Sequence, residues 1–216
     1  MTQPIIATGL SGVVFGFEPW KKAYQEWFKK ASEKLGKSEI RDYSRKPGYS
    51  RYVDKVMRQL KPEASEEERV VEARKRFFDN VCRQVSLRAD YYKNQEVIGV
   101  LNHLKKYYRL ALITTLSHDA VSRILSISKL QGLYNIIECG KPEEKDDKAD
   151  VFNRFLRYYG KPLLYIGGDN KQSFDYCKKN KIPCLFANLR GGADMPGVES
   201  VHNAEELRKL VEEISE

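Results

Sequence analysis

The spacing of hydrophobic residues changes along the first half of the chain. Residues 12–15 form a short apolar run next to glycine, which is typical of a strand buried on both faces of a parallel sheet. Between residues 20 and 35, apolar positions recur at intervals of three and four with lysines between them, which predicts an amphipathic helix. Pro19 suits the first turn of this helix, and Gly36 suits its end.

Two more amphipathic helices are predicted around residues 52–60 and 70–85, after a polar loop over residues 37–51. Strands then alternate with helices to the end of the chain, and this order predicts an α/β fold with a doubly wound, Rossmann-like parallel sheet. The predicted strands cover 110–114, 134–138, 163–166 and 183–187, and the predicted helices cover 97–107, 120–127, 149–159, 173–180 and 204–214. We expect a core of residues 1–18 and 94–216, with residues 19–93 inserted as an α-helical cap.

Charge distinguishes the predicted cap from the core. The chain has 38 Lys and Arg against 30 Asp and Glu, a net charge of +8. Residues 21–93 hold 20 of the basic and 12 of the acidic residues, so the whole surplus falls in the cap. A solvated helical surface is the commoner meaning of such a surplus, and binding of nucleic acid is the alternative.

Composition also narrows the class of protein. Since no segment approaches the roughly 18 apolar residues of a membrane span, and no signal peptide is evident, we expect a soluble cytoplasmic protein. Its cysteines are scattered without a CxxC pair, which predicts reduced thiols rather than a disulfide framework or a zinc site.

The residues at the ends of the predicted strands lie where ligands bind in open α/β sheets. These residues are Gly16 and Glu18 after the first strand, Thr114 and Thr115 after the second, Lys148 before the next helix, and Asp169 after the fourth strand. In this order and spacing they resemble the four motifs of the haloacid dehalogenase (HAD) superfamily, in the subgroup with a helical cap. The resemblance covers nearly the whole chain.

The resemblance implies a specific set of roles. The family uses an aspartate nucleophile, a second acid two residues on, a hydroxyl and a lysine that hold phosphate, and carboxylates that bind Mg²⁺. Carried onto this chain, the nucleophile position is Gly16. Glu18 takes the position of the second acid and is also a candidate metal ligand. The remaining roles fall on Thr114 and Thr115 for phosphate, Lys148 for the lysine and Asp169 for the metal.

Several positions depart from the family pattern. Pro19 and Trp20 replace the glycine and threonine that usually follow the acid pair, and Ser173 stands where a second metal-binding acid is common. Lys141, in a Gly-Lys-Pro sequence, competes with Lys148 for the role of motif lysine. With these carboxylates missing, we expect Mg²⁺ to bind weakly or not at all.

Three functions remain open from the sequence. The favoured hypothesis is a catalytically impaired phosphatase relative that binds a small phosphorylated or anionic ligand. The second is an active Mg²⁺-dependent phosphohydrolase that uses Glu18 and Asp169. The third is binding of nucleic acid or an acidic protein through the cap, where tyrosines alternate with basic residues between Arg41 and Arg58.

Overall fold

The computed structural model describes residues 3–46, 49–144, 147–168 and 170–215. The described strands form one parallel sheet in the order β3-β2-β1-β4-β5-β6. They are β1 (Ile5–Thr8), β2 (Arg109–Thr114), β3 (Ile136–Cys139), β4 (Leu164–Gly167), β5 (Cys184–Ala187) and β6 (Glu199–Val201). The predicted α/β class and parallel sheet are therefore confirmed.

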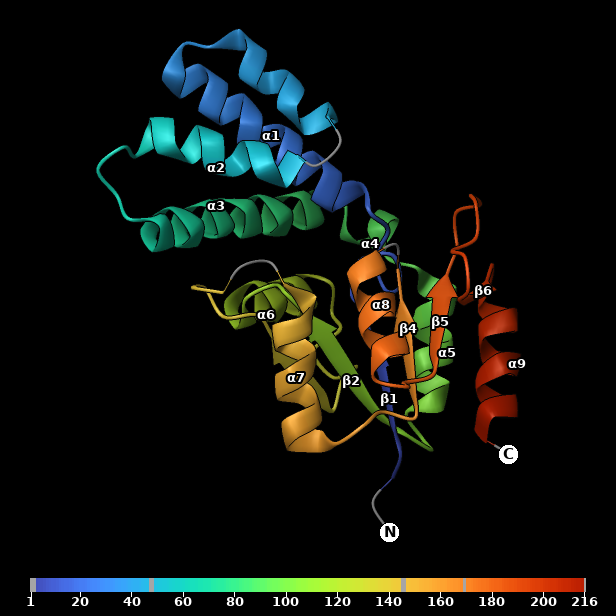
Figure 1. Cartoon of the computed structure of the whole chain (residues 1–216). Helices are drawn as coiled ribbons and strands as arrows, with labels where there is room; N and C mark the ends of the chain where they lie inside the picture. The colour runs from blue at the N-terminus through green and yellow to red at the C-terminus, as the bar shows by residue number, and fades with distance from the viewer. Residues whose placement is uncertain (1–2, 47–48, 145–146, 169, 216) are drawn as a thin grey trace.

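Helices cover both faces of the sheet and form a separate layer beyond its carboxyl end (Figure 1). The first group is α1 (Glu18–Leu35), the 3₁₀ helix η1 (Ser38–Arg45), α2 (Tyr49–Leu60), α3 (Glu66–Leu87) and the short α4 (Ala89–Tyr92). The second is α5 (Gln95–Leu104), α6 (His118–Ile127), α7 (Lys148–Tyr159), α8 (Lys171–Lys179) and α9 (Ala204–Ser215). Helices α5, α6 and α9 pack on one face, and α7 and α8 pack on the other.

The central strand β1 corrects the sequence prediction. Ile6 pairs with Leu110 of β2 and with Leu164 of β4, and every residue of Ile5–Thr8 is buried. Alternate side chains of β1 therefore enter the two hydrophobic clusters on opposite faces of the sheet, as expected for a strand with helices on both sides.

The predicted strand over residues 12–15 is wrong, because this segment is a tight turn. The turn closes when the Gly12 N–H donates to the Phe15 carbonyl at 2.6 Å, and Gly12 has φ of +81°, in the left-handed region that favours glycine. Val13, Val14 and Phe15 are fully buried in the core without joining the sheet. Their apolar character reflects burial, which a turn over the core provides as well as a strand does.

Three smaller predictions also change. The polar stretch predicted as a loop over residues 37–51 contains η1 and the start of α2, and the helix predicted to reach residue 107 ends at Leu104. Strand β6 was not predicted, since its three residues give no usable alternation of apolar and polar side chains.

Helices α1, η1, α2 and α3 form the layer beyond the carboxyl end of the sheet, and we call this layer the cap. Its own hydrophobic cluster centres on Trp27, Phe28 and Met57, whereas the C-terminal half of α3 packs into the cluster of the core. Arg74 of α3 also donates to the backbone carbonyls of Thr115 at 2.6 Å and Glu144 at 2.7 Å. The cap is thus joined to the core by packing along α3 as well as by chain connections.

In the described part of the chain, no helix has both the length and the apolar character needed to cross a membrane. The cysteines carry free thiols; Cys82 and Cys177 are buried, and Cys139 and Cys184 are partly buried.

Candidate anion site at the strand ends

A cavity of about 400 Å³ lies between the carboxyl ends of the strands and the cap. We call it the strand-end cavity. Its floor comes from the segments that follow β1, β2 and β4, and its roof includes Trp20 and Tyr24 of α1 and Phe77 and Phe78 of α3. This is the edge of a parallel sheet at which ligands are expected to bind.

The first strand leads into this cavity through Gly9 and Ser11. The Gly9 N–H donates to the Ile166 carbonyl at 2.9 Å, which holds the end of β1 against β4. A Cβ atom added at Gly9 would lie 3.3 Å from the Tyr165 hydroxyl oxygen, a tight contact that a small shift relieves. Gly9 directly follows the first strand, so this position offers no side chain to the cavity.

The loops after β1 and β4 approach each other closely. A Cβ atom added at Gly168 would lie 2.5 Å from the Ser11 carbonyl oxygen and 2.9 Å from the Gly12 Cα. Real Cβ atoms do not come so near to backbone, so glycine at position 168 permits this part of the cavity floor to close.

The structure brings together the predicted phosphate-binding residues. Thr114 and Thr115 follow β2, Lys148 begins α7, and all three line the strand-end cavity. The Thr114 hydroxyl accepts the Leu116 N–H at 3.2 Å, and the Lys148 ammonium donates to the Ile113 carbonyl. Lys148 is only 6% exposed, so its charge is held close to the end of β2.

Lys141, the competing candidate, lies in the segment after β3 and is exposed. It is not among the described residues that line the cavity.

The structure does not bring Gly16 or Glu18 to the strand-end cavity as the described residues define it. Gly16 follows the turn, and its N–H donates to the Tyr92 carbonyl at 2.9 Å. Glu18 is in the first turn of α1, where its carboxylate lies 3.3 Å from the Lys22 ammonium. Both residues were selected because a strand was expected to end at Phe15, and that expectation is wrong.

Asp169, the predicted metal ligand, lies outside the described residues. Its neighbours Gly168 and Asn170 line the cavity, and the Asn170 side chain caps α8 by accepting the Gln172 N–H at 3.0 Å. Ser173 also lines the cavity and is 1% exposed.

Sequence reasoning missed Gly9, Ser11 and Tyr165. One signal could have found the first two: a glycine usually follows the acid pair in the HAD pattern, and Gly12 follows Ser11 directly. Tyr165 is buried beside Ser173; burial raises the pKa of its phenol, and the Ser173 hydroxyl partly offsets this rise. Tyr165 therefore stays protonated near neutral pH and can donate a hydrogen bond.

The polar groups around the cavity suit an anion. Hydroxyl side chains come from Ser11, Tyr24, Ser44, Thr114, Thr115, Tyr165 and Ser173, and ammonium groups from Lys21 and Lys148. The described lining residues include no carboxylate, and the described chain holds no group of three His, Cys, Asp or Glu residues arranged for a metal ion. The hydroxyl and ammonium donors of these described residues suit the oxygen atoms of a phosphate-type anion.

No protein-family model and no curated protein matches the sequence. Solved structures do match, over nearly the whole chain. A HAD phosphatase from Thermococcus onnurineus shares 15% identity at a TM-score of 0.64, with 98% of each chain covered. YfnB from Bacillus subtilis, assigned as a HAD-hydrolase and bound to magnesium, shares 10% identity at a TM-score of 0.62, with 98% of this chain and 100% of that chain covered.

CbbY from Rhodobacter sphaeroides, in complex with phosphate, shares 14% identity at a TM-score of 0.63 and covers 95% of this chain and 96% of its own. The structural similarity establishes the fold, whereas sequence identities this low leave the activity open. The chain has the fold of the haloacid dehalogenase superfamily hydrolases, as the order of its strand-end motifs predicted.

Proposed function

We propose that this protein binds a small phosphorylated ligand in the strand-end cavity and does not hydrolyse it. One observation carries the proposal: Gly9 follows the first strand directly, while Thr114, Thr115 and Lys148 line the same cavity. The family pattern places its nucleophilic aspartate after the first strand and its second acid two residues later. On this chain those positions become Gly9 and Ser11.

Each lining group has a defined part in binding. The Lys148 ammonium supplies a positive charge that is largely shielded from solvent, which strengthens its attraction for a phosphate oxygen. Hydroxyl groups of Thr115 and Ser11 can donate to other phosphate oxygens, and the phenol of Tyr165 remains a donor over the physiological pH range. None of these groups is a carboxylate that could accept a phosphoryl group.

The competing hypothesis of a hydrolase using Glu18 has less support. The Glu18 side chain is paired with Lys22 and is 42% exposed. Its neighbours Phe17 and Lys21 line the cavity, whereas Glu18 is not among the described lining residues. Asp169 alone would leave one carboxylate for both metal binding and chemistry.

Binding of Mg²⁺ is a separate part of the proposal. Bound Mg²⁺ would supply positive charge beside a phosphate, and Asp169 and Asn170 offer oxygen atoms in the segment after β4. With Gly9, Ser11 and Ser173 at the other positions, we expect phosphate binding that changes little when Mg²⁺ is removed by a chelator.

The basic segment from Arg41 to Arg58 favours a solvated surface over a nucleic-acid site. Its described tyrosines, Tyr43 and Tyr52, stack on each other at 4.6 Å, and the Lys46 ammonium lies 5.2 Å and 5.7 Å from their ring centroids. These aromatic faces are already engaged within the cap, so they are poorly available to stack on bases. We expect only weak, salt-sensitive binding of nucleic acid here.

Calorimetric titration with inorganic phosphate tests ligand binding, with Lys148→Met as the disabling variant and Lys141→Met as its matched control. We expect Lys148→Met to weaken binding at least about tenfold, because it removes the shielded positive charge. Lys141→Met should bind like the unaltered protein. Equal affinity of all three proteins for phosphate would contradict the proposed site.

Phosphate release from a panel of small phosphomonoesters tests the absence of hydrolysis. The unaltered protein should release none above background, with or without Mg²⁺, because uncatalysed hydrolysis of phosphate monoesters is extremely slow. The matched comparison is Gly9→Asp with Ser11→Asp, which restores the carboxylates at the strand end. Turnover by the unaltered protein, abolished by Glu18→Gln, would overturn the proposal in favour of the hydrolase hypothesis.

A further inference from the structure

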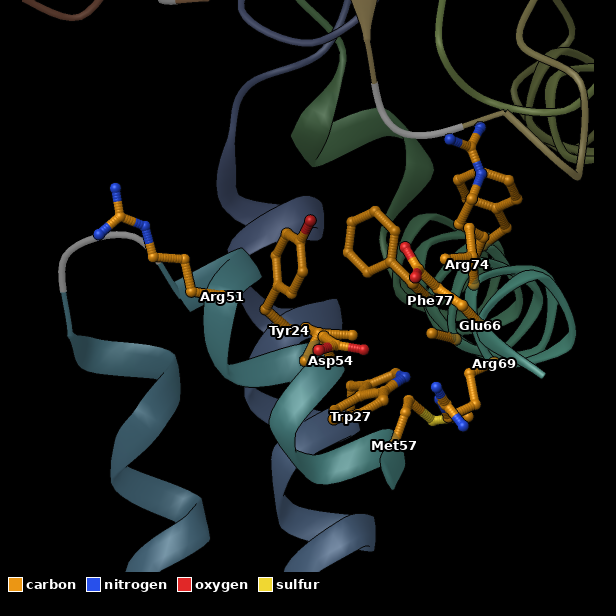
Figure 2. Close-up of a pocket in the computed structure, with 13 residues that line it drawn as sticks. Tyr24, Trp27, Arg51, Asp54, Met57, Glu66, Arg69, Arg74 and Phe77 are labelled. Carbon is orange, nitrogen blue, oxygen red and sulfur yellow. The ribbon is translucent and has the colours of Figure 1, made fainter. Parts of the chain in front are cut away.

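A second, larger cavity lies inside the cap, away from the strand ends. It has a volume of about 560 Å³ and is lined by α1, α2 and α3 (Figure 2). We call it the cap cavity. Tyr24, Phe77 and Phe78 line both cavities, so these rings form the wall between the two. A volume of this size is within the range of sites that bind small organic molecules.

Most of the cap cavity wall is aromatic or aliphatic. Tyr24 and Phe77 stack with their ring centroids 4.0 Å apart. The other apolar lining residues are Trp27, Val53, Met57, Val70, Ala73 and Phe78. Such a surface fits the face and edge of a flat aromatic ring system, through offset stacking and contact with the methionine sulfur.

The wall contains two buried hydrogen-bond donors, on Trp27 and Arg69, that meet no acceptor among the described residues. The Trp27 indole N–H is buried, on a side chain that is 3% exposed, and it meets no acceptor among the described residues. The Nε–H of Arg69 is likewise buried without an acceptor in the described chain, while its guanidinium reaches the Ala64 carbonyl through another nitrogen. Figure 2 shows the indole nitrogen directed toward the side of α3, where Arg69 lies.

Buried N–H groups without acceptors are uncommon, because losing water without gaining a partner is unfavourable. A ligand that carries an oxygen acceptor into the cavity would satisfy them.

The charged residues of the lining favour a negatively charged ligand. Three arginines line the cavity against two carboxylates, those of Asp54 and Glu66. Asp54 is already paired with Arg58 at 3.0 Å, which reduces its repulsion of an anion. A carboxylate placed near Trp27 and Arg69 would therefore meet two N–H donors, and the Arg69 guanidinium would supply a positive charge.

We propose that the cap cavity is a binding site for an aromatic carboxylic acid, separate from the phosphate site at the strand ends. The ring system packs against Met57 and the free edges of the stacked Tyr24 and Phe77 rings. The carboxylate accepts hydrogen bonds from the Trp27 indole and Arg69. This site does not depend on whether the strand-end cavity binds phosphate, since the residues that carry it belong to the cap.

The two tryptophans allow the cavities to be observed separately. The chain contains Trp20, which lines the strand-end cavity, and Trp27, which lines the cap cavity. In a Trp20→Phe variant, fluorescence reports on the cap cavity alone. The probe is 1-naphthoate, and its neutral analogue 1-naphthalenemethanol tests the need for a carboxylate.

We expect 1-naphthoate to change Trp27 emission saturably, with a Kd below roughly 1 mM. Val70→Phe should weaken this binding at least about tenfold, because the added ring fills the cavity. The matched control is Val71→Phe, the same change at the next position of α3, which is outside the described lining and should have little effect. The neutral alcohol should bind at least about fivefold more weakly than the acid.

Calorimetry with Trp27→Phe provides a second measurement that does not depend on how well Val70→Phe folds. This variant retains an aromatic ring and removes the N–H, so we expect weaker binding of 1-naphthoate and little change for the alcohol. The proposal is overturned if 1-naphthoate does not bind, if folded Val70→Phe binds it as tightly as Val71→Phe, or if acid and alcohol bind equally well.

Discussion

The two cavities share a wall but are built in different ways. The strand-end cavity is floored by backbone and by hydroxyl and ammonium groups at the ends of parallel strands. The cap cavity is walled by side chains of helices, mostly aromatic or aliphatic. Backbone in contact with backbone cannot yield without moving a strand, whereas side chains between helices can change rotamer. The strand-end cavity should therefore be the more rigid and the cap cavity the more adaptable.

The largest expected effect tests this difference in rigidity. Gly168→Ala places a Cβ atom 2.5 Å from the Ser11 carbonyl, so we expect a loss of about 3 kcal/mol in the free energy of unfolding. Val70→Phe in the cap cavity should cost less than about 1 kcal/mol, because open space receives the ring. Urea denaturation gives the free energy of unfolding of both variants and of the unaltered protein.

Gly99→Ala is the control for the change from glycine to alanine itself. Gly99 lies in α5 with no heavy atom near its added Cβ, so alanine there should stabilise by roughly 0.5 to 1 kcal/mol. Equal stability of Gly168→Ala and the unaltered protein would contradict the rigid floor.

A smaller effect concerns the shared wall. Phe77→Ala removes the ring that stacks on Tyr24 and separates the cavities, and we expect a loss of about 2 kcal/mol because Phe77 is only partly buried. Opening the wall should also make 1-naphthoate alter Trp20 emission in a Trp27→Phe background. Phe77→Leu, which keeps much of the apolar bulk, should show less of both effects. If Phe77→Ala still binds 1-naphthoate by calorimetry and leaves the two tryptophan signals independent, these rings do not separate the cavities.

Variants of one cavity should affect only the ligand of that cavity. We expect a change of about 1.4 kcal/mol or more in its binding free energy, which is a tenfold change in affinity. Lys148→Met should lower phosphate affinity and leave 1-naphthoate binding unchanged, and Val70→Phe should do the reverse. Paired titrations of each variant with both probes measure this. A variant that weakens both ligands equally would indicate a single connected site.

The smallest expected effect is a pH dependence of the stability of the fold, which arises at His202, outside both cavities. His202 lies 3.0 Å from Asp194 and 3.2 Å from Glu206, and hydrogen bonds to these carboxylates raise its pKa above the ordinary value of 6.5. The stabilisation is fully present below the ordinary value and is lost as pH rises through the raised pKa. Because the group is exposed, the effect should be small.

Thermal unfolding of His202→Gln between about pH 5.5 and 8.5 tests this pH dependence. The variant should lose part of the decrease in Tm across this range, and its phosphate and 1-naphthoate affinities should match those of the unaltered protein. An unchanged pH profile would exclude His202 as its source.

The sequence by itself determined the fold class and part of the candidate site. Alternating apolar strands and amphipathic helices after residue 93 predict a parallel sheet, since strands with helices on both faces are apolar along their whole length. Parallel strands end at one edge of their sheet, which places Thr114 at that edge, and the resemblance to the HAD motifs implied that Lys148 lies there too.

Only the tertiary structure decided where the first strand lies. Residues 5–8 and residues 13–15 are both short, apolar and buried, and burial follows from packing in a turn as well as in a sheet. Hydrogen bonding of β1 between β2 and β4 distinguishes them, and such pairing joins residues more than a hundred positions apart. The cap cavity also depends on tertiary structure, because the distance between packed helices depends on all the side chains between them, whereas periodicity identifies only the face that is buried.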